Sequence, residues 1–449
     1  MPNPPFEIRG VVEGFYGEPW SHANRLRATE LFPEFGFNTY LIAPKDDPTQ
    51  RIRWREQLSG GQMHQTSELI ERGLKNGLNV AMTVSPGLSV QYSSLEDREY
   101  VLQRFIQQSQ WGCSLFALLW DDIDWDLQYE EDLRSYEFIE DAQADFSNWL
   151  FTELLLRNPK SQMMVCPMIY NGRGQNSYIA RLGEKLHSNI DLMWTGREIR
   201  SPYLDSIDAE TFTLNAGRRP LYWDNFPVNN LSMRFELHMG PLIGRQPELA
   251  ITSRGLLSNP MNQFECSLLP LFTIGQFLSS PDKYDAEVSW QMGFDRLFGN
   301  HKLANELSRF FRTVMSSPIN SDAAPEVRKG LSVALNHLRQ GQRQLAAELI
   351  QSIGKQISQD AIVLLAATQK EGVFREISPW LPKYRLGGEA LKSLAEFTLH
   401  PTDRNLANLI GLSAKLDADR HIVFGDVLDG VIDEIIHSHP KSNSDGSEG

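Results

Sequence analysis

Two adjacent acids, Asp121 and Asp122, follow directly on an apolar run that ends at Trp120. Like charges that share a pocket of low dielectric raise at least one pKa, so one acid of the pair could stay protonated near neutral pH. Glycoside hydrolysis needs such an acid to protonate the leaving oxygen. A solvated acidic turn or a metal site is the alternative interpretation of the pair.

The adjacency of the two acids favours one form of that chemistry. The usual acid and nucleophile stand about 5 Å or more apart across the scissile bond, which two side chains on one short backbone segment cannot easily do. Neighbouring acids fit the variant in which the substrate's own acetamido oxygen attacks the anomeric carbon and forms an oxazoline. One carboxylate then orients the acetamido nitrogen, and the other acts first as acid and then as base.

Two further segments offer groups that suit a neutral sugar. Residues 14–20 hold two glycines and a proline, which shape a tight loop, and aromatic rings that could stack on a sugar. Residues 223–230 begin with Trp223 and end with Asn229 and Asn230, so they combine an aromatic face with amides that donate and accept hydrogen bonds. Each segment could also be an ordinary turn, and the two asparagines could cap a helix.

Several other chemistries lack a sequence signal. The ten histidines show no metal-ligand spacing, and there is no phosphate-binding loop and no Gly-x-Ser-x-Gly elbow. We therefore expect neither a metal nor a cofactor. A Cys/His hydrolase is not excluded by pattern, but nothing supports it. The net charge of −14 and the absence of basic runs argue against nucleic acid and against a polyanionic substrate.

Cysteine usage and hydropathy bear on the compartment. Cys113, Cys166 and Cys266 are few, odd in number and far apart, so they read as reduced thiols and not as a disulfide framework. No apolar segment of the signal-peptide or membrane-spanning kind is present. We expect a cytoplasmic protein that does not contact membranes, with export not excluded.

The first 280 residues alternate short apolar runs with segments of helical periodicity. Eight strands alternating with helices predict an α/β fold of the (β/α)8 barrel type. Most of the apolar runs end near Gly, Asp, Lys, Tyr, Thr, Trp or Asn, and in such a barrel these strand ends meet on one face. The predicted strands are residues 8–13, 38–43, 79–84, 114–120, 163–166, 192–194, 221–223 and 255–257.

From about residue 284 the pattern changes to helical spacing alone. Leu303, Leu307, Phe310, Phe311 and Val314 lie on one helical face, and further helices are predicted over 326–338, 345–351 and 389–397. We therefore expect a catalytic barrel over residues 1–283, an all-helical domain over 284–440 and a disordered tail, rich in Ser and Gly, over 441–449.

Taken together, the ordered motifs resemble glycoside hydrolase family 84, the O-GlcNAcase and bacterial β-N-acetylglucosaminidase family, whose bacterial members are often labelled hyaluronidase-like. The resemblance covers residues from about 8 to about 280. It rests on GVVEGFYGEPW (10–20), YLIAPKDD (40–47), SPGL (85–88), FALLWDDID (116–124), WTG (194–196) and WDN (223–225). Each motif alone is weak, and their shared order makes the match specific.

The resemblance implies a role for each candidate residue. Asp121 would orient the acetamido group, and Asp122 would be the general acid and base. Tyr170 would hydrogen-bond near the reacting centre. The acetamido pocket would be lined by Cys166, Thr195 and Trp223, and the sugar hydroxyls or the glycosidic region would be bound by Gly14, Lys45, Asn225 and Asn259.

One position departs from the family pattern. Family members usually carry an aspartate five residues after the position of Asn225, where it binds the 4- and 6-hydroxyls, and this chain has Asn230 there. An amide still hydrogen-bonds but loses a charge-assisted contact, which is typically about twice as strong as a neutral one. The change puts sugar affinity and the discrimination of GlcNAc from GalNAc in question.

The sequence thus predicts a retaining β-N-acetylglucosaminidase that works by substrate-assisted catalysis on a GlcNAc-bearing glycan or glycoprotein. Two alternatives remain: a hyaluronan-type hexosaminidase, which the acidic charge argues against, and a catalytically weak GlcNAc-binding protein, which the retention of both acids argues against. The natural aglycone, the oligomeric state and the role of the helical domain are not set by the sequence.

Overall fold

The computed structural model describes residues 3–368 and 372–437, which form two compact units. The first comprises Met1–Ser232 and Pro241–Gly293, and the second comprises Met233–Gly240 and Phe294–Gly449. Helix α10, Ala286–Phe298, contributes to both units, so the predicted domain boundary after residue 283 stays a prediction. The predicted tail over 441–449 lies outside the described residues.

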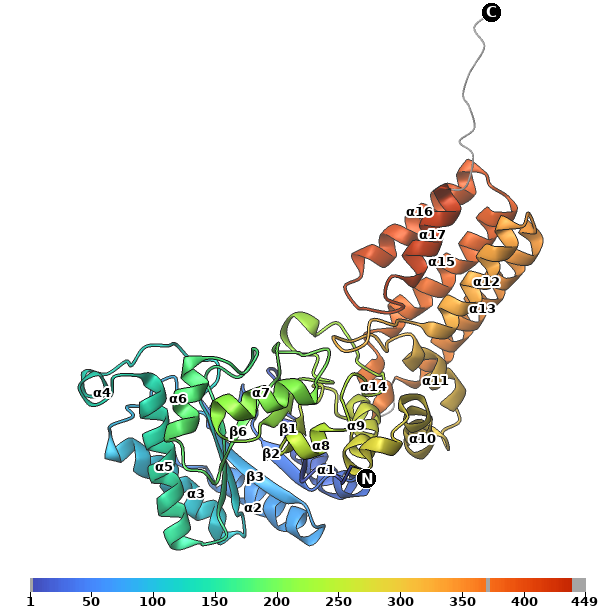
Figure 1. Cartoon of the computed structure of the whole chain (residues 1–449). Coiled ribbons are helices and arrows are strands. Elements are labelled where there is room, and N and C mark those ends of the chain that lie inside the picture. The colour runs from blue at the N-terminus through green and yellow to red at the C-terminus, as the bar shows by residue number, and fades with distance from the viewer. Residues whose placement is uncertain (1–2, 369–371, 438–449) are drawn as a thin grey trace, which may run out of the picture. The chain divides into compact units, whose positions relative to one another are not determined.

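The first unit is the expected (β/α)8 barrel (Figure 1). Its strands pair in parallel in sequence order, and β8 closes the barrel against β1. Every predicted strand is present, with ends within two residues of those expected. The strands are β1 Ile8–Glu13, β2 Thr39–Ile42, β3 Asn79–Val84, β4 Leu115–Leu119, β5 Gln162–Cys166, β6 Ile190–Trp194, β7 Leu221–Asp224 and β8 Gly255–Ser258.

Burial explains why these strands were readable from the sequence. A parallel strand covered on both faces appears as a short, almost continuous apolar run. The side chains that fill the barrel come from all eight strands and from the first residues beyond them. This core contains Val12, Leu41, Ala43, Ala81, Leu115, Ala117, Leu119, Met164, Cys166, Met193, Leu221, Trp223 and Leu257.

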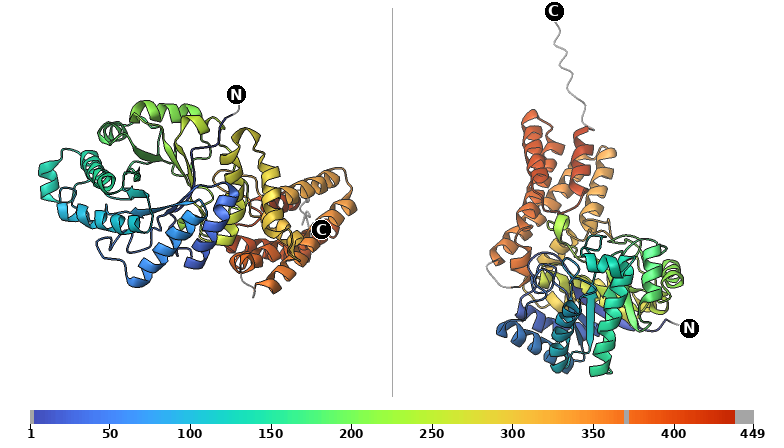
Figure 2. Two further views of the ribbon diagram at one scale, coloured as in Figure 1. Left: turned by 90° about the horizontal axis from the view of Figure 1, so that it is seen from below. Right: turned by 90° about the vertical axis from the view of Figure 1, so that its left-hand side faces the viewer.

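Helices surround the strands (Figures 1 and 2). Local sequence fixes several of their starts: Ser59 and Gln62 form a capping box at α2, and the Ser94 hydroxyl caps α3. The helices of this unit are α1 His22–Phe35, α2 Gly60–Lys75, α3 Leu95–Gln110, α4 Glu130–Ser135, α5 Ile139–Arg157, α6 Ser177–Lys185, α7 Ser206–Ala216, α8 Leu249–Thr252 and α9 Phe264–Ser279.

The second unit is helical throughout its described residues, as expected. Two of its helices, α13 (Arg343–Ala367) and α15 (Leu381–Leu399), are much longer than predicted. In α13, buried Gly354, Ser358 and Asp360 interrupt the apolar periodicity. Gly354 lets α13 approach α15 closely, since a Cβ there would lie 2.8 Å from the Gly388 carbonyl oxygen. The helices are α11 Ala304–Arg312, α12 Pro325–Arg339, α13 Arg343–Ala367, α14 Val373–Ile377, α15 Leu381–Leu399, α16 Asp403–Ala418 and α17 Val427–His437.

Two kinds of feature are missing from the described residues. Their helices do not combine the length and hydrophobicity that crossing a bilayer requires. Nor do any three of their His, Cys, Asp or Glu side chains gather in a way that could hold a metal ion.

Candidate active site

The barrel brings the candidate residues to one face. All of them except Asn230 lie at the carboxyl end of a strand or within four residues beyond it, and those ends surround one opening of the barrel. Seven strands contribute: Gly14 follows β1, Lys45 β2, Asp121 and Asp122 β4, Tyr170 β5, Thr195 β6, Asn225 β7 and Asn259 β8, while Cys166 and Trp223 lie within β5 and β7.

Asp121 forms a buried ion pair at the bottom of the site. Its Oδ2 accepts a hydrogen bond from the Lys45 ammonium, and the two side chains are only 7% and 4% exposed. Its Oδ1 is also buried but has no hydrogen-bond partner among the described residues. Because a buried carboxylate oxygen without a donor is costly, Oδ1 is a strong acceptor that is available to a bound ligand.

Lys45 is held as a cation by its surroundings. Burial lowers its pKa, but the negative charges of Asp121 and Asp122 raise that pKa by more, so the net change is upward. The ammonium also lies 5.8 Å from the centroid of the Trp223 ring, in a cation–π contact. A permanently charged Lys45 keeps one oxygen of Asp121 occupied and leaves the other open.

Asp122 lies beside this pair but is exposed to solvent. Its backbone is in the left-handed region, with φ of 56°, which aspartate tolerates better than most residues. Three groups hold it: the Tyr16 hydroxyl donates to Oδ2 at 2.5 Å, the Tyr170 hydroxyl to Oδ1 at 2.9 Å, and Arg51 Nη2 to the main-chain oxygen at 2.6 Å. Its carboxylate is therefore oriented by two phenols from different strand ends.

The expectation that charge repulsion keeps one acid protonated is wrong for Asp122. Its partial burial raises its pKa, but the charge of Lys45 and the hydrogen bonds from Tyr16 and Tyr170 outweigh that effect, and the pKa lies below its ordinary value. The adjacency of the two acids does not show the charge of Lys45 or the hydrogen bonds from Tyr16 and Tyr170, which come from other strand ends. In the unliganded structure Asp122 is ionised at neutral pH.

Cys166 and Thr195 line the wall of the site beside Tyr170. Burial, and secondarily the charge of Asp121, raises the pKa of the Cys166 thiol far above its usual range, so the side chain is neutral and unsuited to attack. Thr195 donates from its backbone nitrogen to the Tyr170 oxygen at 2.7 Å and from its hydroxyl to the Glu198 oxygen at 2.8 Å. These bonds fix the segment that carries Tyr170.

Four candidates form a continuous chain of contacts on the other side of the opening. Trp223 Nε1 donates to Asn225 Oδ1 at 3.0 Å, Asn259 Nδ2 donates to the same oxygen at 2.9 Å, and the Gly14 amide donates to Asn259 Oδ1 at 3.3 Å. Glycine is required beside the indole, because a Cβ on Gly14 would lie 2.2 Å from Trp223 Cζ2. The Trp223 ring is thus locked in one place.

Asn230 is the one candidate that these contacts do not reach. Its side chain is half-buried, and no hydrogen bond, ion pair or ring contact among the described residues joins it to the cluster. Asn229 is buried instead and bonds Gln263 Oε1 at 2.8 Å and the Asn262 amide at 3.2 Å. Asn230 directly precedes a short 3-10 helix, Leu231–Met233, so the alternative that the asparagines cap a helix stays a prediction.

Some interactions of the site had no sequence signal or a misleading one. Among the rings of residues 14–20, Phe15 and Trp20 are core residues that pack against each other, so they do not stack on a sugar. Tyr16 is a hydrogen-bond donor to Asp122, and Arg51 donates to the Tyr16 hydroxyl at 3.0 Å. Arg51 lies in an irregular loop, whose path no periodicity reveals.

A buried ion pair that the sequence did not indicate supports the Trp223–Asn225 segment. Asp224, between these two residues, forms a buried bidentate ion pair with Arg245 at 2.7 and 2.8 Å. Arg245 also donates to the main-chain oxygens of Ser201, Pro202 and Ile243. The pair joins the loops after β6 and β7 and so positions the aromatic wall.

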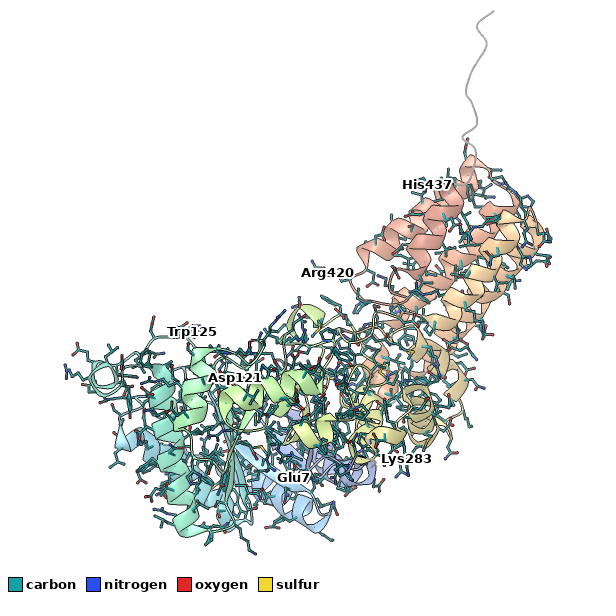
Figure 3. The ribbon with its side chains drawn as sticks, viewed as in Figure 1. Glu7, Asp121, Trp125, Lys283, Arg420 and His437 are labelled. Carbon is teal, nitrogen blue, oxygen red and sulfur yellow. The ribbon has the colours of Figure 1, made fainter. Side chains whose placement is uncertain are left out.

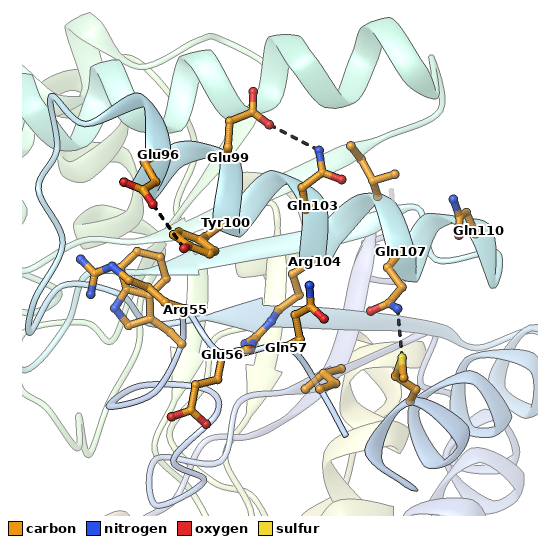
Figure 4. Close-up of a pocket in the computed structure, with 14 residues that line it drawn as sticks. Arg55, Glu56, Gln57, Glu96, Glu99, Tyr100, Gln103, Arg104, Gln107 and Gln110 are labelled. Carbon is orange, nitrogen blue, oxygen red and sulfur yellow. Dashed lines mark hydrogen bonds between the residues drawn. The ribbon is translucent and has the colours of Figure 1, made fainter. Parts of the chain in front are cut away.

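The candidate residues are separate from a hollow on the flank of the barrel (Figure 4). This hollow has a volume of about 510 Å³ and is lined by α3, by Met63 of α2 and by residues 54–58. Its lining includes Tyr100 and several glutamines but no residue of the carboxylate site. The candidate residues therefore gather at the barrel opening and not in this hollow.

The chain matches known proteins along most of its length. A family model described as beta-N-acetylglucosaminidase matches residues 9–312. Two proteins named Protein O-GlcNAcase, from Rattus norvegicus and Mus musculus, are each 32% identical over 277 residues, which is 60% of this chain and 30% of the relative. The chain thus spans less than a third of the length of these curated relatives.

Two solved structures are similar over almost the whole chain. A mutant of the O-GlcNAc hydrolase of Thermobaculum terrenum superposes with a TM-score of 0.88 and 30% identity, covering 96% of this chain and 95% of the other. A structure titled "Structure of CpGH84B" has a TM-score of 0.84 over 96% of this chain and 77% of the other. At 23% identity, the latter supports the fold alone.

Proposed function

The chain belongs to the β-N-acetylglucosaminidase family, glycoside hydrolase family 84, and from this premise we propose that it is a retaining hydrolase that removes terminal β-linked GlcNAc. The proposed substrates are proteins that carry O-GlcNAc, or glycans that end in GlcNAc. The proposed mechanism is substrate-assisted, with the acetamido group of the sugar as the nucleophile.

The observation that carries this proposal is the division of labour within the acid pair. Asp121 is buried, with Oδ2 occupied by Lys45 and Oδ1 without a partner among the described residues. Asp122 is exposed and bonded through two tyrosine hydroxyls. One acid is thus arranged to accept a hydrogen bond from a ligand, and its neighbour can exchange protons with a group above the opening.

In the proposed first step, Asp121 Oδ1 accepts a hydrogen bond from the acetamido N–H, which increases the electron density on the acetamido oxygen. That oxygen attacks the anomeric carbon as the bond to the leaving oxygen breaks, and Asp122 gives its proton to the leaving oxygen. Lys45 remains paired with Asp121 and stabilises its charge. The products are the free aglycone and a bound oxazoline in its N-protonated form, whose N–H stays hydrogen-bonded to Asp121.

In the second step, Asp122 takes a proton from water as the water oxygen attacks the anomeric carbon, and the oxazoline opens to the acetamido group. The two displacements at one carbon give net retention. Asp122 must hold a proton before the first step, although its pKa is lowered in the unliganded structure. A neutral sugar that covers Asp122 and displaces water would raise that pKa, because desolvation disfavours the charged form.

The remaining candidates keep their expected roles within this proposal. Cys166, Thr195 and Trp223 would surround the acetamido methyl and carbonyl groups, and Gly14, Lys45, Asn225 and Asn259 would face the sugar hydroxyls or the glycosidic region. Asn230 would contribute a neutral contact at most. The cytoplasmic location expected from the cysteines and the exclusion of nucleic acid as a partner stay predictions.

The test is the release of nitrophenol from an aryl β-N-acetylglucosaminide by the wild type and by Asp121→Ala. We expect turnover by the wild type and a loss of kcat/KM of at least about a hundredfold in the variant, since it removes charge stabilisation at the reacting centre. Equal rates would reject the role of Asp121. Binding of GlcNAc without turnover by the wild type would instead favour the sugar-binding alternative, and Asn230→Asp would be the next variant.

A further inference from the structure

A half-buried arginine, Arg51, reaches the proposed general acid from the loop after β2. Its Nη2 donates to the Asp122 main-chain oxygen at 2.6 Å, and its Nη1 donates to the Tyr16 hydroxyl oxygen at 3.0 Å. The same loop carries Lys45, whose ammonium pairs with Asp121, the chain neighbour of Asp122 that Figure 3 labels. One loop thus places a cation beside each member of the acid pair.

Structural pairing does not explain the position of the Arg51 guanidinium. None of the described carboxylates forms an ion pair with it, and its buried Nε has no hydrogen-bond partner among the described residues. Arg53, two residues further on, is 53% exposed and pairs with Glu56 at 3.3 Å. A buried donor without a partner costs stability, which indicates that the contacts of Arg51 to Tyr16 and Asp122 serve another purpose.

The segment that carries Arg51 is fixed to the barrel. The preceding residue, Gln50, is buried, and its Oε1 accepts from the Thr83 hydroxyl of β3 at 2.9 Å. The Gln50 main-chain oxygen accepts from the Ser85 amide at 2.9 Å, and the Arg51 amide donates to the Pro48 oxygen at 3.3 Å. This support holds the guanidinium in one place relative to the acids.

Arg51 determines where the Tyr16 proton points. A phenol has one proton to donate and an oxygen that can accept. Because the Arg51 Nη1–H occupies that oxygen, the single proton is left for Asp122 Oδ2, which lies 2.5 Å from the Tyr16 oxygen. Burial, and then the hydrogen bond to Asp122, raises the pKa of Tyr16, so the phenol keeps this proton.

Arg51 also holds the main chain of Asp122 in an unusual conformation. The φ angle of 56° lies in the left-handed region, which costs most L-residues about 1–2 kcal/mol. The bond from Arg51 Nη2 to the Asp122 oxygen orients the peptide unit that follows. Loss of this bond would let the backbone relax and turn the carboxylate away from Tyr16 and Tyr170.

We propose that Arg51 is a positioning residue for the general acid and base: its two hydrogen bonds keep the Tyr16 proton directed at Asp122 and favour the carboxylate form that activates water in the second step. The inference rests on the proposed function, which assigns both proton transfers to Asp122. Arg51 itself transfers no proton, and it acts through Tyr16 and through the Asp122 main chain.

The surroundings of Asp122 set the sign of the expected effect. Its charged and titratable neighbours come from four strand ends and are Tyr16, Lys45, Arg51, Asp121, Cys166 and Tyr170. Burial raises the pKa of Asp122, whereas the charge of Lys45, the two phenol hydrogen bonds and the charge of Arg51 lower it. Removing Arg51 takes away its charge and weakens the Tyr16 bond, so the pKa of Asp122 should rise.

The experiment measures kcat against pH for the wild type and Arg51→Ala with two substrates. An alkyl β-N-acetylglucosaminide reports on Asp122 as the acid of the first step. A dinitrophenyl β-N-acetylglucosaminide, whose leaving group needs no proton, reports on Asp122 as the base of the second step. An acid loses activity as pH rises through its pKa and a base loses activity as pH falls through it, so both limbs should move to higher pH.

The alkyl substrate also separates catalysis from binding. For Arg51→Ala we expect kcat to fall about tenfold, because the acid is no longer held in place. We expect KM to stay within about threefold, because the contacts that bind the sugar are untouched.

Three further variants distinguish positioning from a general loss of charge or of structure. In a Tyr16→Phe background, Arg51→Ala should shift the profile less than it does in the wild type, because the two residues act on one hydrogen bond. Arg53→Ala is the matched control, since it removes an exposed arginine from the same loop, and its profile should match that of the wild type. Arg51→Lys keeps the charge, should lie between the wild type and Arg51→Ala, and tests the inference if Arg51→Ala does not fold.

Several results would overturn the inference. These are profiles of Arg51→Ala that coincide with the wild type or move to lower pH, a fall in kcat with no shift of either limb, and shifts of Arg51→Ala and Tyr16→Phe that add in full. A wild type that hydrolyses neither substrate would instead count against the proposed function itself.

Discussion

Each unit of the molecule contains a buried carboxylate paired with a cation, and the two differ in one respect. In the helical unit, Asp360 accepts from Arg309 at 2.7 and 2.8 Å, from Gln356 at 2.9 Å and from Tyr384 at 3.4 Å. Both of its oxygens are therefore occupied. In the barrel, Asp121 has Lys45 on one oxygen and no partner among the described residues on the other.

This difference separates structure from function more clearly than burial or charge does. Removing one partner from a buried ion pair is costly in either unit, because the remaining charge is left without compensation. Of the two carboxylates, only Asp121 has a buried oxygen without a partner among the described residues, which costs stability unless a ligand supplies the donor. Saturated carboxylates such as Asp360 and Asp224 hold the fold, and the unsaturated one marks the site.

The largest expected effect is on the proton donor beside the unsaturated acid. Asp122→Asn cannot protonate a leaving group, so we expect kcat/KM to fall about a thousandfold for an alkyl β-N-acetylglucosaminide and far less for an activated aryl substrate. Steady-state kinetics on a series of leaving groups measures the difference. Equal losses across the series would show that Asp122 is not the acid.

The counterpart in the helical unit should affect stability and leave activity unchanged. Asp360→Asn breaks the bidentate pair with Arg309, which is 41% exposed and keeps Glu306 at 3.7 Å. We expect a loss of about 2 kcal/mol in the free energy of unfolding, the usual size for hydrogen bonds to charged groups. Urea unfolding followed by circular dichroism measures this loss, and kcat/KM on the aryl substrate should stay within about twofold of wild type.

Asp433→Asn is the matched control for this stability change, because Asp433 is exposed on α17. It should cost less than about 0.5 kcal/mol. Loss of activity in Asp360→Asn at a temperature where the protein remains folded would contradict the assignment of Asp360 to stability alone.

The smallest expected effect is a shift of a pH profile. Burial raises the pKa of Asp122, whereas Lys45 and then the hydrogen bonds from Tyr16 and Tyr170 lower it. Tyr16→Phe removes one lowering contribution, so the pKa of Asp122 should rise. A group that acts as an acid loses activity as pH rises through its pKa, and kcat reports that pKa in the substrate complex. The alkaline limb of the kcat profile should therefore move to higher pH.

The pH profiles of the wild type and of Tyr100→Phe should coincide, because Tyr100 is exposed and lies outside the site. A shift of the Tyr16→Phe limb to lower pH would contradict the assignment of Asp122 as the acid. An unchanged limb would show that the Tyr16 hydrogen bond has no part in setting its pKa.

Sequence patterns predicted most of the barrel because each buried parallel strand is a short apolar run with a polar end. The family resemblance named Lys45 and Tyr170, and the structure brings them into contact with Asp121 and Asp122, since strand ends meet on one face whatever the loops do. The sequence patterns missed the partnership of Tyr16 and Arg51 with Asp122, because irregular loops bring those groups together. The sequence patterns predicted too short a helix for α13, because Gly354, Ser358 and Asp360 occupy buried positions where apolar residues would have continued the helical periodicity.

The central claim is that the substrate supplies the nucleophile while Asp121 orients it. Its most direct test compares hydrolysis of nitrophenyl β-N-acetylglucosaminide with that of nitrophenyl β-glucoside, which has a hydroxyl in place of the acetamido group. The account predicts turnover of the first and no enzymatic release from the second, at any concentration of enzyme that gives a measurable rate with the first. Robust release of nitrophenol from the plain glucoside would contradict it, because the protein would then have to provide a nucleophile of its own.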